Sequence, residues 1–250
     1  MAAEPLLRGC AVTRAWGGVV AVNGVSIELH RGEVHALIGT NGAGKSTLIN
    51  LLAGQLRPSA GTVSFRGEPL RAARPERMAR LGIGRTFQRS NVFPEFSAFE
   101  NCRLAAQARL PRAWALLESA AHCRSSGEAA MRALEIVGLS ERRDAAASIL
   151  SHGERRALEI AMCLATEPSV LLLDEPLAGM GAEESQRVIE LLRRLRSDRA
   201  ILLVEHDMDA VFAVADVITV MADGVVIASG LPEAVRADPT VREAYLGDGI

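Results

Sequence analysis

The sequence predicts an α/β protein: a mostly parallel sheet flanked by helices, with an N-terminal antiparallel β subdomain and an inserted α-helical subdomain. Three observations along the 250 residues predict this fold class. Alternating or continuously apolar runs, typical of strands, fill most of the first third of the chain. From about Pro94 to Ala165 the apolar residues recur at helical spacing, and strand-like runs then return with a helix between the first two. This alternation predicts an α/β core that is interrupted by a helical insertion.

The strands are predicted from two kinds of pattern. Residues 25–29 and 61–65 alternate apolar and polar side chains, which is typical of half-buried strands. Continuously apolar runs indicate strands covered on both faces. Such runs lie at 170–173 and 200–204, and the runs at 33–38 and 217–221 are mostly apolar. After the last of them, Asp223-Gly224 is expected to close a hairpin.

The helical stretch is predicted to interrupt one domain that spans residues 1–250. Breaks at Pro111, at residues 125–127 and at Gly138 separate its helices. We expect 1–88 and 166–250 to form the catalytic core and 89–165 to form the helical subdomain.

Composition excludes several classes of protein. Apolar residues make up 49% of the chain and charged residues 23%, so disorder is excluded as the main state. The net charge of −2 provides no basic field, and nucleic acid is not expected as a partner. The longest apolar stretch, 210–222, is broken by Asp216 and is too short to span a membrane. Because the first residues also lack the pattern of a secretion signal, we expect a cytoplasmic chain unless a partner holds it at a membrane.

The four cysteines do not form a recognisable metal site. They are Cys10, Cys102, Cys123 and Cys163, without a C-x-x-C pair and without a histidine at metal-ligand spacing. We expect buried structural thiols in a reducing compartment.

A glycine-rich segment predicts a nucleoside triphosphate site. Residues 39–46 match G-x-x-x-x-G-K-[ST] between the buried strand at 33–38 and a helix expected over 46–53. Its glycines permit a backbone whose N–H groups converge on phosphate oxygens. Lys45, the only lysine of the chain, would neutralise the outer phosphates, and the Ser46 hydroxyl can ligate Mg²⁺. The predicted nucleotide contacts are Gly39, Thr40, Asn41, Gly42, Ala43, Gly44, Lys45, Ser46 and Thr47.

Two carboxylates follow the predicted strand at 170–173. Asp174 suits the Mg²⁺ shell through a water, and Glu175 can take a proton from an attacking water. The structural alternative is a strand that simply ends in polar residues.

A second phosphate contact is predicted at the start of a helix. Ser151 and Glu154 have the spacing of a capping box, which alone explains both residues. Capping does not explain Gly153, because glycine destabilises a first turn. A helix start with little side-chain bulk is what an additional phosphate contact would need.

These motifs, in this order, closely resemble those of the ATP-binding subunits of ABC transporters over nearly the whole chain. The resemblance implies a P-loop NTPase core, ATP and Mg²⁺. Ser151, Gly153 and Glu154 correspond to its signature, with His152 where glycine is commoner and Glu154 where glutamine is commoner. Gln88 resembles the glutamine that reaches Mg²⁺ and the attacking water. His206 resembles the switch histidine at the γ-phosphate; a structural histidine at a strand end is the alternative.

The resemblance extends to the base and to the dimer contact. Trp16 resembles the aromatic residue that stacks on adenine; the alternative is a tryptophan that packs in the core or between subdomains. Val22 is also expected to contact the nucleotide. Gly181 stands where many members have an aspartate that contacts the second subunit, which puts that contact in doubt without removing the groups expected to perform hydrolysis.

The resemblance also implies partners. The signature of one subunit completes the nucleotide site of another, two domains close on two ATP molecules, and transmembrane permease subunits convert the closure into transport. The segment with Phe93, Phe96 and Phe99 would help receive a cytoplasmic helix of the permease; the alternative is a helical-subdomain core. We expect the chain to be peripheral on the inner face of the cell membrane.

Residues 16–22, 178–181 and 241–247 resemble those of the branched-chain amino acid importers, which are served indirectly by a solute-binding protein and usually pair two different ATPase chains. A heterodimer with a second ATP-binding subunit is therefore favoured over a homodimer. A urea or amide importer, a lipopolysaccharide exporter and a soluble ATPase of iron–sulfur assembly remain as alternatives. An ATPase of translation or DNA repair would carry two nucleotide domains or a coiled coil, and a small-molecule kinase would give Ser151 no role.

Overall fold

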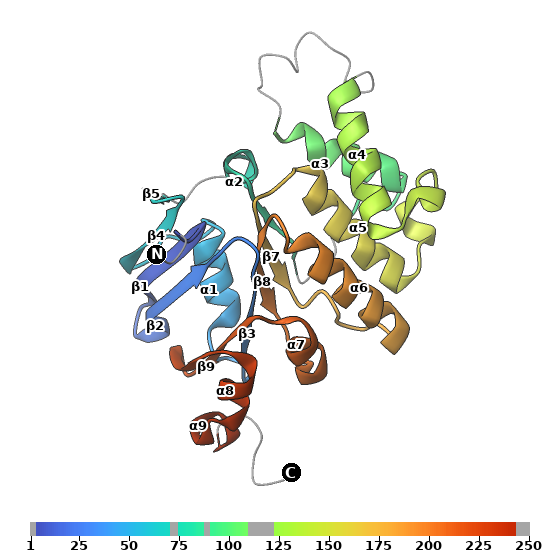
Figure 1. Cartoon of the computed structure of the whole chain (residues 1–250). Coiled ribbons are helices and arrows are strands. Elements are labelled where there is room, and N and C mark those ends of the chain that lie inside the picture. The colour runs from blue at the N-terminus through green and yellow to red at the C-terminus, as the bar shows by residue number, and fades with distance from the viewer. Residues whose placement is uncertain (1–3, 71–74, 88–90, 110–122, 244–250) are drawn as a thin grey trace.

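Two sheets organise the computed structural model, which describes residues 4–70, 75–87, 91–109 and 123–243 (Figure 1). The larger sheet has six strands in the spatial order β10-β9-β3-β8-β7-β6. Along the chain they are β3 (Val34–Gly39), β6 (Ile83–Arg85), β7 (Val170–Asp174), β8 (Ala200–Val204), β9 (Val217–Ala222) and β10 (Val225–Gly230). The strands from β9 to β6 run parallel, and β10 pairs antiparallel with β9 through a turn at Asp223-Gly224. The predicted parallel sheet and its hairpin are confirmed.

The smaller sheet is antiparallel and lies on the N-terminal side of the molecule (Figure 1). Its strands, in the spatial order β2-β1-β4-β5, are β2 (Val19–Leu29), β1 (Leu7–Trp16), β4 (Ala60–Phe65) and β5 (Glu68–Pro69). The segments predicted at 25–29 and 61–65 lie in β2 and β4. This sheet is the predicted antiparallel β subdomain.

Helices surround the larger sheet and form a separate group at one side. They are α1 (Lys45–Leu52), α2 (Pro75–Leu81), α3 (Ala98–Gln107), α4 (Arg124–Val137), α5 (His152–Ala165), α6 (Ala182–Leu195), α7 (Met208–Val214), α8 (Pro232–Ala237) and α9 (Pro239–Val241). Short 3₁₀ turns lie at Ser140–Arg142 and Ala147–Ile149. In Figure 1, α3, α4 and α5 gather beside the sheet, within the predicted insertion at 89–165. No helix in the part of the chain described here has the length and apolarity needed to cross a bilayer.

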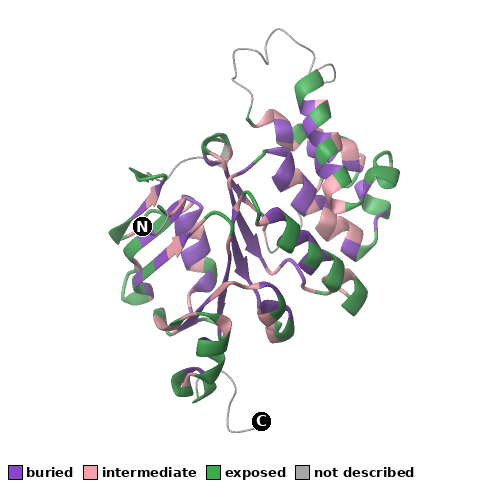
Figure 2. Cartoon of the chain, viewed as in Figure 1, coloured by how far each residue is buried: buried purple, intermediate pink, exposed green. Residues whose placement is uncertain are grey.

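The central strands are buried on both faces, which explains their continuous apolar runs (Figure 2). Alternate residues of β7 enter two different clusters. Val170 and Leu172 pack with α1 and the smaller sheet, whereas Leu171 and Leu173 pack with the helices on the other side. The sheet therefore joins two cores, and its position is determined from both sides.

Several details differ from the predictions. The strands β1 and β5 were not predicted, and the break expected at 125–127 is wrong, because α4 begins at Arg124 and continues through these residues. The three-residue strand β6 was not predicted, because Ile83-Gly84-Arg85 is too short to show a period and is a strand only through its pairing with β7. Burial of the thiols is confirmed for Cys102 and Cys163, and burial raises the pKa of each to about 12. It is wrong for Cys10, which is exposed, and for Cys123, which is half-buried at the start of α4.

Candidate nucleotide site

The carboxyl ends of neighbouring parallel strands meet at one edge of the larger sheet. β3 ends at Gly39, β8 at Val204 and β7 at Asp174, in this spatial order. Open α/β sheets bind ligands at such an edge. The fold thereby brings together the loop after β3, the carboxylates of Asp174 and Glu175 at the end of β7, and His206 after β8.

The loop after β3 requires glycine at two positions because other strands approach it closely. A Cβ on Gly39 would collide with the carbonyl oxygen of Met221 in β9. A Cβ on Gly44 would collide with the carbonyl oxygen of Ala21 in β2, and Gly44 has a φ of 95°. The hairpin after β9 holds the loop further, since the N–H of Gly224 donates to the oxygen of Ala43 at 3.2 Å. The two sheets thus shape the loop before any ligand binds.

The first turn of α1 is open to an anion. Gly44 is the N-cap residue, no side chain caps the helix, and no acidic residue lies in the first turn. The first N–H groups of a helix have no partner within it, so here they can serve an external acceptor. Ser46 is exposed and Thr47 half-buried at this turn. These features fit a phosphate group and leave the Ser46 hydroxyl available as an oxygen ligand.

Lys45 is folded back into its own loop. Its Nζ donates to the oxygen of Gly39 at 2.7 Å and to the oxygen of Thr40 at 3.1 Å. Burial lowers the pKa of Lys45, while the nearby carboxylates of Glu175 and Asp174 act in the opposite direction. The ammonium group therefore lies between the loop and the acidic end of β7.

Asp174 is buried and held by an arginine that the sequence analysis did not single out. Its Oδ2 accepts from the guanidinium of Arg85 at 3.4 Å, and the same guanidinium donates to Asn50 Oδ1 at 2.5 Å and Gln55 Oε1 at 2.9 Å. Burial raises the pKa of Asp174, and Arg85 opposes that rise. The signal that could have identified Arg85 as a site residue is its position in the chain, three residues before Gln88.

Glu175 has an unusual backbone conformation that directs the chain away from β7. Its φ is 49°, in the left-handed region that side chains disfavour. Its N–H donates to the oxygen of Val204 at 2.9 Å, and its Oε1 lies 3.6 Å from Nδ1 of His206. His206 is 57% exposed at the side chain, so the imidazole faces the open side of the site. The acid and the histidine predicted from separate motifs are neighbours.

Glu205, between β8 and His206, is a second residue that the sequence analysis missed. It is buried, its Oε1 accepts from the N–H of Leu177 at 2.8 Å, and its Oε2 accepts from the N–H of His206 at 3.3 Å. An acid directly before the histidine was a weak signal, because acids at strand ends are common and its burial was not evident.

The start of α5 forms the capping box that the sequence predicted. Ser151 Oγ accepts from the N–H of Glu154 at 3.1 Å, and Glu154 Oε2 accepts from the N–H of Ser151 at 2.8 Å. The backbone hydrogen bond from Ser151 lowers the pKa of Glu154. Gly153 has a neighbour that the sequence did not reveal, because a Cβ there would collide with the carboxylate of Glu184 in α6.

His152 connects this helix start to the turn after Glu175. Its Nε2 donates to the oxygen of Ala178 at 3.0 Å. Gly179 follows with a φ of 75°, and a Cβ there would lie 2.9 Å from the same Nε2. Gly181 begins α6, where its N–H donates to Glu184 Oε2 at 3.3 Å. The signature segment and the turn at 177–181 are therefore joined within one chain.

Trp16 and Val22 have different environments. Trp16, at the end of β1, is 45% exposed, and the guanidinium of Arg14 lies 4.7 Å from its ring centre. The alternative of a core tryptophan is wrong, and stacking of the ring on adenine stays a prediction. Val22 is fully buried, with its Cγ2 3.4 Å from a Cβ placed on Gly44, so it supports the phosphate loop from below. Its contact with nucleotide stays a prediction, and Gln88 lies outside the described residues.

The three phenylalanines between positions 93 and 99 separate into two groups. Phe93 and Phe96 are exposed and stack with ring centres 5.3 Å apart, whereas Phe99 is half-buried against the core. Asn101 is fully buried and holds their loop: its Oδ1 accepts from the N–H of Phe93 at 2.8 Å, and its Nδ2 donates to the oxygens of Phe93 and Phe96. The core alternative is confirmed for Phe99, and the other two rings are presented at the surface.

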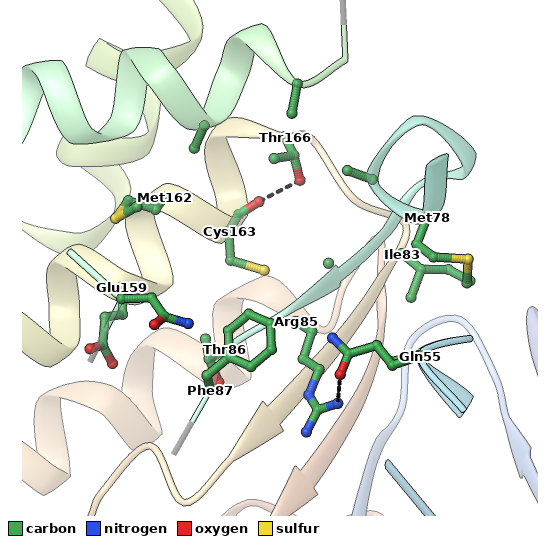
Figure 3. A pocket seen from close by; sticks show the side chains of 16 residues that line it. Gln55, Met78, Ile83, Arg85, Thr86, Phe87, Glu159, Met162, Cys163 and Thr166 are labelled. Atoms are coloured by element: carbon green, nitrogen blue, oxygen red, sulfur yellow. Dashed lines mark hydrogen bonds between the residues drawn. The ribbon is translucent and has the colours of Figure 1, made fainter. Parts of the chain in front are cut away.

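A largely apolar groove of about 260 Å³ lies between the core and the helical group (Figure 3). Its walls come from β6 and the residues after it, from α2, and from α3 and α5. Met78, Ile83, Phe87, Met162 and Cys163 provide most of the labelled apolar side chains. Figure 3 shows Arg85 at one side of the groove, hydrogen-bonded to Gln55. The groove therefore adjoins the residue that contacts Asp174.

The chain matches two protein-family models. The model of the ABC transporter matches residues 22–178, which is more than half of the chain and includes the phosphate loop, the signature segment and both carboxylates. The chain belongs to the ABC transporter family. The model of the branched-chain amino acid ATP-binding cassette transporter matches residues 225–250, in the C-terminal part of this ABC protein.

Curated relatives match the ABC chain over almost its whole length. The high-affinity branched-chain amino acid transport ATP-binding protein LivG of Salmonella typhimurium is 41% identical, with 98% of this chain and 99% of the relative covered. LivG of Escherichia coli K12 is 40% identical and BraF of Pseudomonas aeruginosa 38%, with the same coverage.

Solved ABC cassettes have the same fold. A nucleotide-free ATP-binding cassette from an ABC transporter superposes with a TM-score of 0.87 at 31% identity, covering 98% of this chain and all of that one. An ADP-bound conformation of an ABC cassette gives the same TM-score, identity and coverage. The predicted family and fold class are confirmed.

Proposed function

We propose that this chain hydrolyses ATP and thereby drives a membrane importer of branched-chain amino acids. The observation that carries the proposal is the assembly at one sheet edge of the phosphate loop, Asp174, Glu175 and His206, with Glu175 Oε1 3.6 Å from the histidine. The branched-chain names of the full-length relatives and of the C-terminal family model support the transported substrate.

Each residue of the site has a role in this proposal. Residues 39–47 bind the phosphates, and Trp16, with Val22 behind the loop, receives the adenine. The hard oxygen donors Ser46, Gln88 and Asp174 suit Mg²⁺, which supplies charge neutralisation on the phosphates. Glu175 accepts the proton of the attacking water, and His206 donates to the γ-phosphate. Lys45 leaves the carbonyl groups of its own loop and donates to the outer phosphates instead.

The proposed working unit contains two nucleotide-binding chains. Ser151, Gly153 and Glu154 of one chain complete the site of the other, and closure on two ATP molecules is the step that performs work. A second, different ATP-binding subunit is favoured, and a homodimer is the alternative. Residues 1–88 and 166–250 act as the catalytic core, and 89–165 as the helical subdomain.

The apolar groove in Figure 3 is the proposed docking site for a cytoplasmic helix of a transmembrane permease. Its apolar walls suit one face of an amphipathic helix. The exposed pair Phe93 and Phe96 follows closely in the chain after Asn91, which lines the groove. Docking places the chain on the inner face of the cell membrane, and a solute-binding protein delivers the amino acid to the permease from the other side.

The test is an affinity purification of the tagged chain from its native membrane in mild detergent, with mass identification of the proteins that accompany it. We expect two permease chains and a second ATP-binding chain. Proteoliposomes made from that complex and its binding protein should then take up labelled leucine only when ATP and Mg²⁺ are supplied. Uptake of urea or of a short amide instead of leucine would correct the substrate. Recovery of soluble partners alone would overturn the transport assignment.

A further inference from the structure

A buried carboxylate stands between the two segments that carry Glu175 and His206. Glu205 is 1% exposed and follows β8 directly. One of its oxygens accepts from the N–H of Leu177 at 2.8 Å, and the other accepts from the N–H of His206 at 3.3 Å. A single side chain therefore bonds the backbone of both segments.

Burial at this position disfavours a charge. It raises the pKa of Glu205, and the two backbone donors act against that rise. An apolar side chain would avoid the desolvation, but it would leave the buried N–H of Leu177 without its acceptor. The two backbone N–H groups that it accepts from therefore explain why a carboxylate occupies this buried position.

The turn after β7 needs such support because Glu175 lies in the left-handed region, with a φ of 49°. A residue in this conformation persists only where its surroundings over-determine it. Two hydrogen bonds to β8 and its extension flank the strained position: Glu175 N–H to Val204 O at 2.9 Å and Leu177 N–H to Glu205. Both connect to β8 or to Glu205, the residue that joins this strand to His206.

From this geometry we propose that Glu205 is a positioning residue that fixes the positions of Glu175 and His206 relative to each other. The inference rests on the proposed function, in which those two residues serve hydrolysis. Glu205 makes the turn at 175–178 and the backbone of His206 move as one unit. The bond from His152 to the oxygen of Ala178 extends this unit to the start of α5. A displacement of the signature helix would therefore reach His206 through the turn.

The first experiment compares the complete chain with its Glu205→Gln variant. Glutamine preserves the shape of the side chain but replaces one acceptor oxygen by a donor, so only one of the two bonds survives. We expect kcat for ATP hydrolysis to fall about tenfold or more, while KM and the Kd of a fluorescent ADP change less than about twofold. In a chain that already carries Glu175→Gln, the second change should have little further effect, because both residues serve one step.

Two further variants make the comparison specific. Glu205→Asp keeps the charge but is one methylene shorter and cannot span both N–H groups, so it should lower kcat in the same way. Asp216→Asn is the matched control, because Asp216 Oδ2 accepts from the N–H of Val34 at 2.9 Å at the opposite end of the sheet. The substitution alters a carboxylate that accepts from a backbone N–H, and also the ion pair of Asp216 with Arg196, away from the site, so its kcat should stay within about twofold.

A second readout does not depend on hydrolysis. The imidazole ¹H–¹⁵N signals of His206, assigned with His206→Gln, should shift in the Glu205→Gln chain and stay in place in Asp216→Asn. If the wild-type chain hydrolyses ATP while Glu205→Gln leaves both kcat and these signals unchanged, the positioning role is wrong and the proposed function stands. If the purified wild-type complex hydrolyses no ATP, the proposed function is wrong, and shifted His206 signals would still support the positioning role.

Discussion

At the scale of single residues, the site combines a lysine whose hydrogen bonds can be exchanged with backbone positions that are tightly constrained. Lys45 donates to two carbonyl groups of its own loop, and those bonds can be exchanged for phosphate oxygens at little cost. Gly44 and Glu175 have no such freedom, because both have positive φ angles and contact a neighbouring strand. Changes at Lys45 should therefore act on binding, and side-chain changes at Glu175 on chemistry.

Lys45→Met should weaken ATP binding because a charge-assisted hydrogen bond to phosphate is lost. Such bonds contribute about 1.5–3 kcal/mol, so the Kd should rise by about 10- to 150-fold. Isothermal titration with ATP measures it, and Arg66→Met, which removes a positive charge beside Phe65, is the control. An unchanged Kd in the Lys45 variant would contradict its role at the phosphates.

Glu175→Gln should retain ATP binding and slow hydrolysis by about 10² to 10⁴, because the amide cannot accept the proton of the attacking water. Phosphate release under single-turnover conditions measures the rate, and fluorescent nucleotide measures the affinity. Near-normal turnover would exclude Glu175 as the general base.

At the scale of elements, two helices begin with the same device in different settings. Ser97 and Glu100 form a capping box at the start of α3, as Ser151 and Glu154 do at α5. Only the box at α5 adjoins the turn after Glu175, through His152. A comparison of the two capping boxes therefore distinguishes the stability that such a box supplies from any function of the signature segment.

Ser151→Arg should leave the nucleotide affinity of the isolated chain nearly unchanged but block ATP-dependent dimer closure, since a long cation then occupies the shared face. Ser97→Arg is the control, because it also removes a cap, at a cost of about 1 kcal/mol, and leaves α5 intact. Sedimentation of each variant in the Glu175→Gln background with ATP measures closure. A dimer formed normally by Ser151→Arg would refute the shared-site arrangement.

The capping boxes should also give stability a dependence on acid pH. Hydrogen bonds from Ser97 and Ser151 lower the pKa of Glu100 and Glu154 below the ordinary value of 4.5. The stabilisation is therefore present above that value and is lost as the pH falls through the lowered pKa of the folded state. Urea midpoints of wild type and of the Glu100→Gln, Glu154→Gln double variant should differ at neutral pH and converge on acidification. A pH-independent difference would assign the effect to packing instead.

At the scale of the whole molecule, the proposed docking groove and the nucleotide site lie on either side of the segment 85–87. Arg85 contacts Asp174 and lines the groove, and Phe87 lies in the groove wall. The hydroxyl of Thr86 accepts from the N–H of Asp174 at 3.2 Å, which ties the two strand ends together. An occupant of the groove would therefore contact residues that directly support the acidic end of β7.

Phe93→Ala should reduce recovery of the permease while leaving the fold intact, because the ring is exposed and Asn101 still holds the loop backbone. Substitutions at such surface positions change stability by about 0.5 kcal/mol or less. Leu231→Ala, an exposed apolar residue before α8, is the matched control. Quantitative mass spectrometry of the purified complexes measures recovery, and equal recovery from both variants would contradict docking at this surface.

The parts of the site that depend on neighbouring residues were predictable. The phosphate loop follows a strand and precedes a helix within one segment, so its chemistry and its position were present together. The capping box at Ser151 spans four residues and formed as predicted. Arg85, Glu205 and Glu184 were missed because each acts on a residue distant in the chain. The residues next to Gly153 in the chain do not indicate that the carboxylate of Glu184 in α6 lies beside it.

Periodicity, capping and the glycine-rich loop are local properties, so most strands, the amphipathic helices and the reactive groups could be predicted from the sequence. Which of those groups meet depends on contacts between segments that are distant in the chain. Parallel pairing of β3, β8 and β7 brings their carboxyl ends to one edge, and packing from both faces of the sheet holds the Glu175 turn against β8. The separation of Glu175 and His206 is therefore a property of the assembled core, since it depends on long-range burial that no single segment contains.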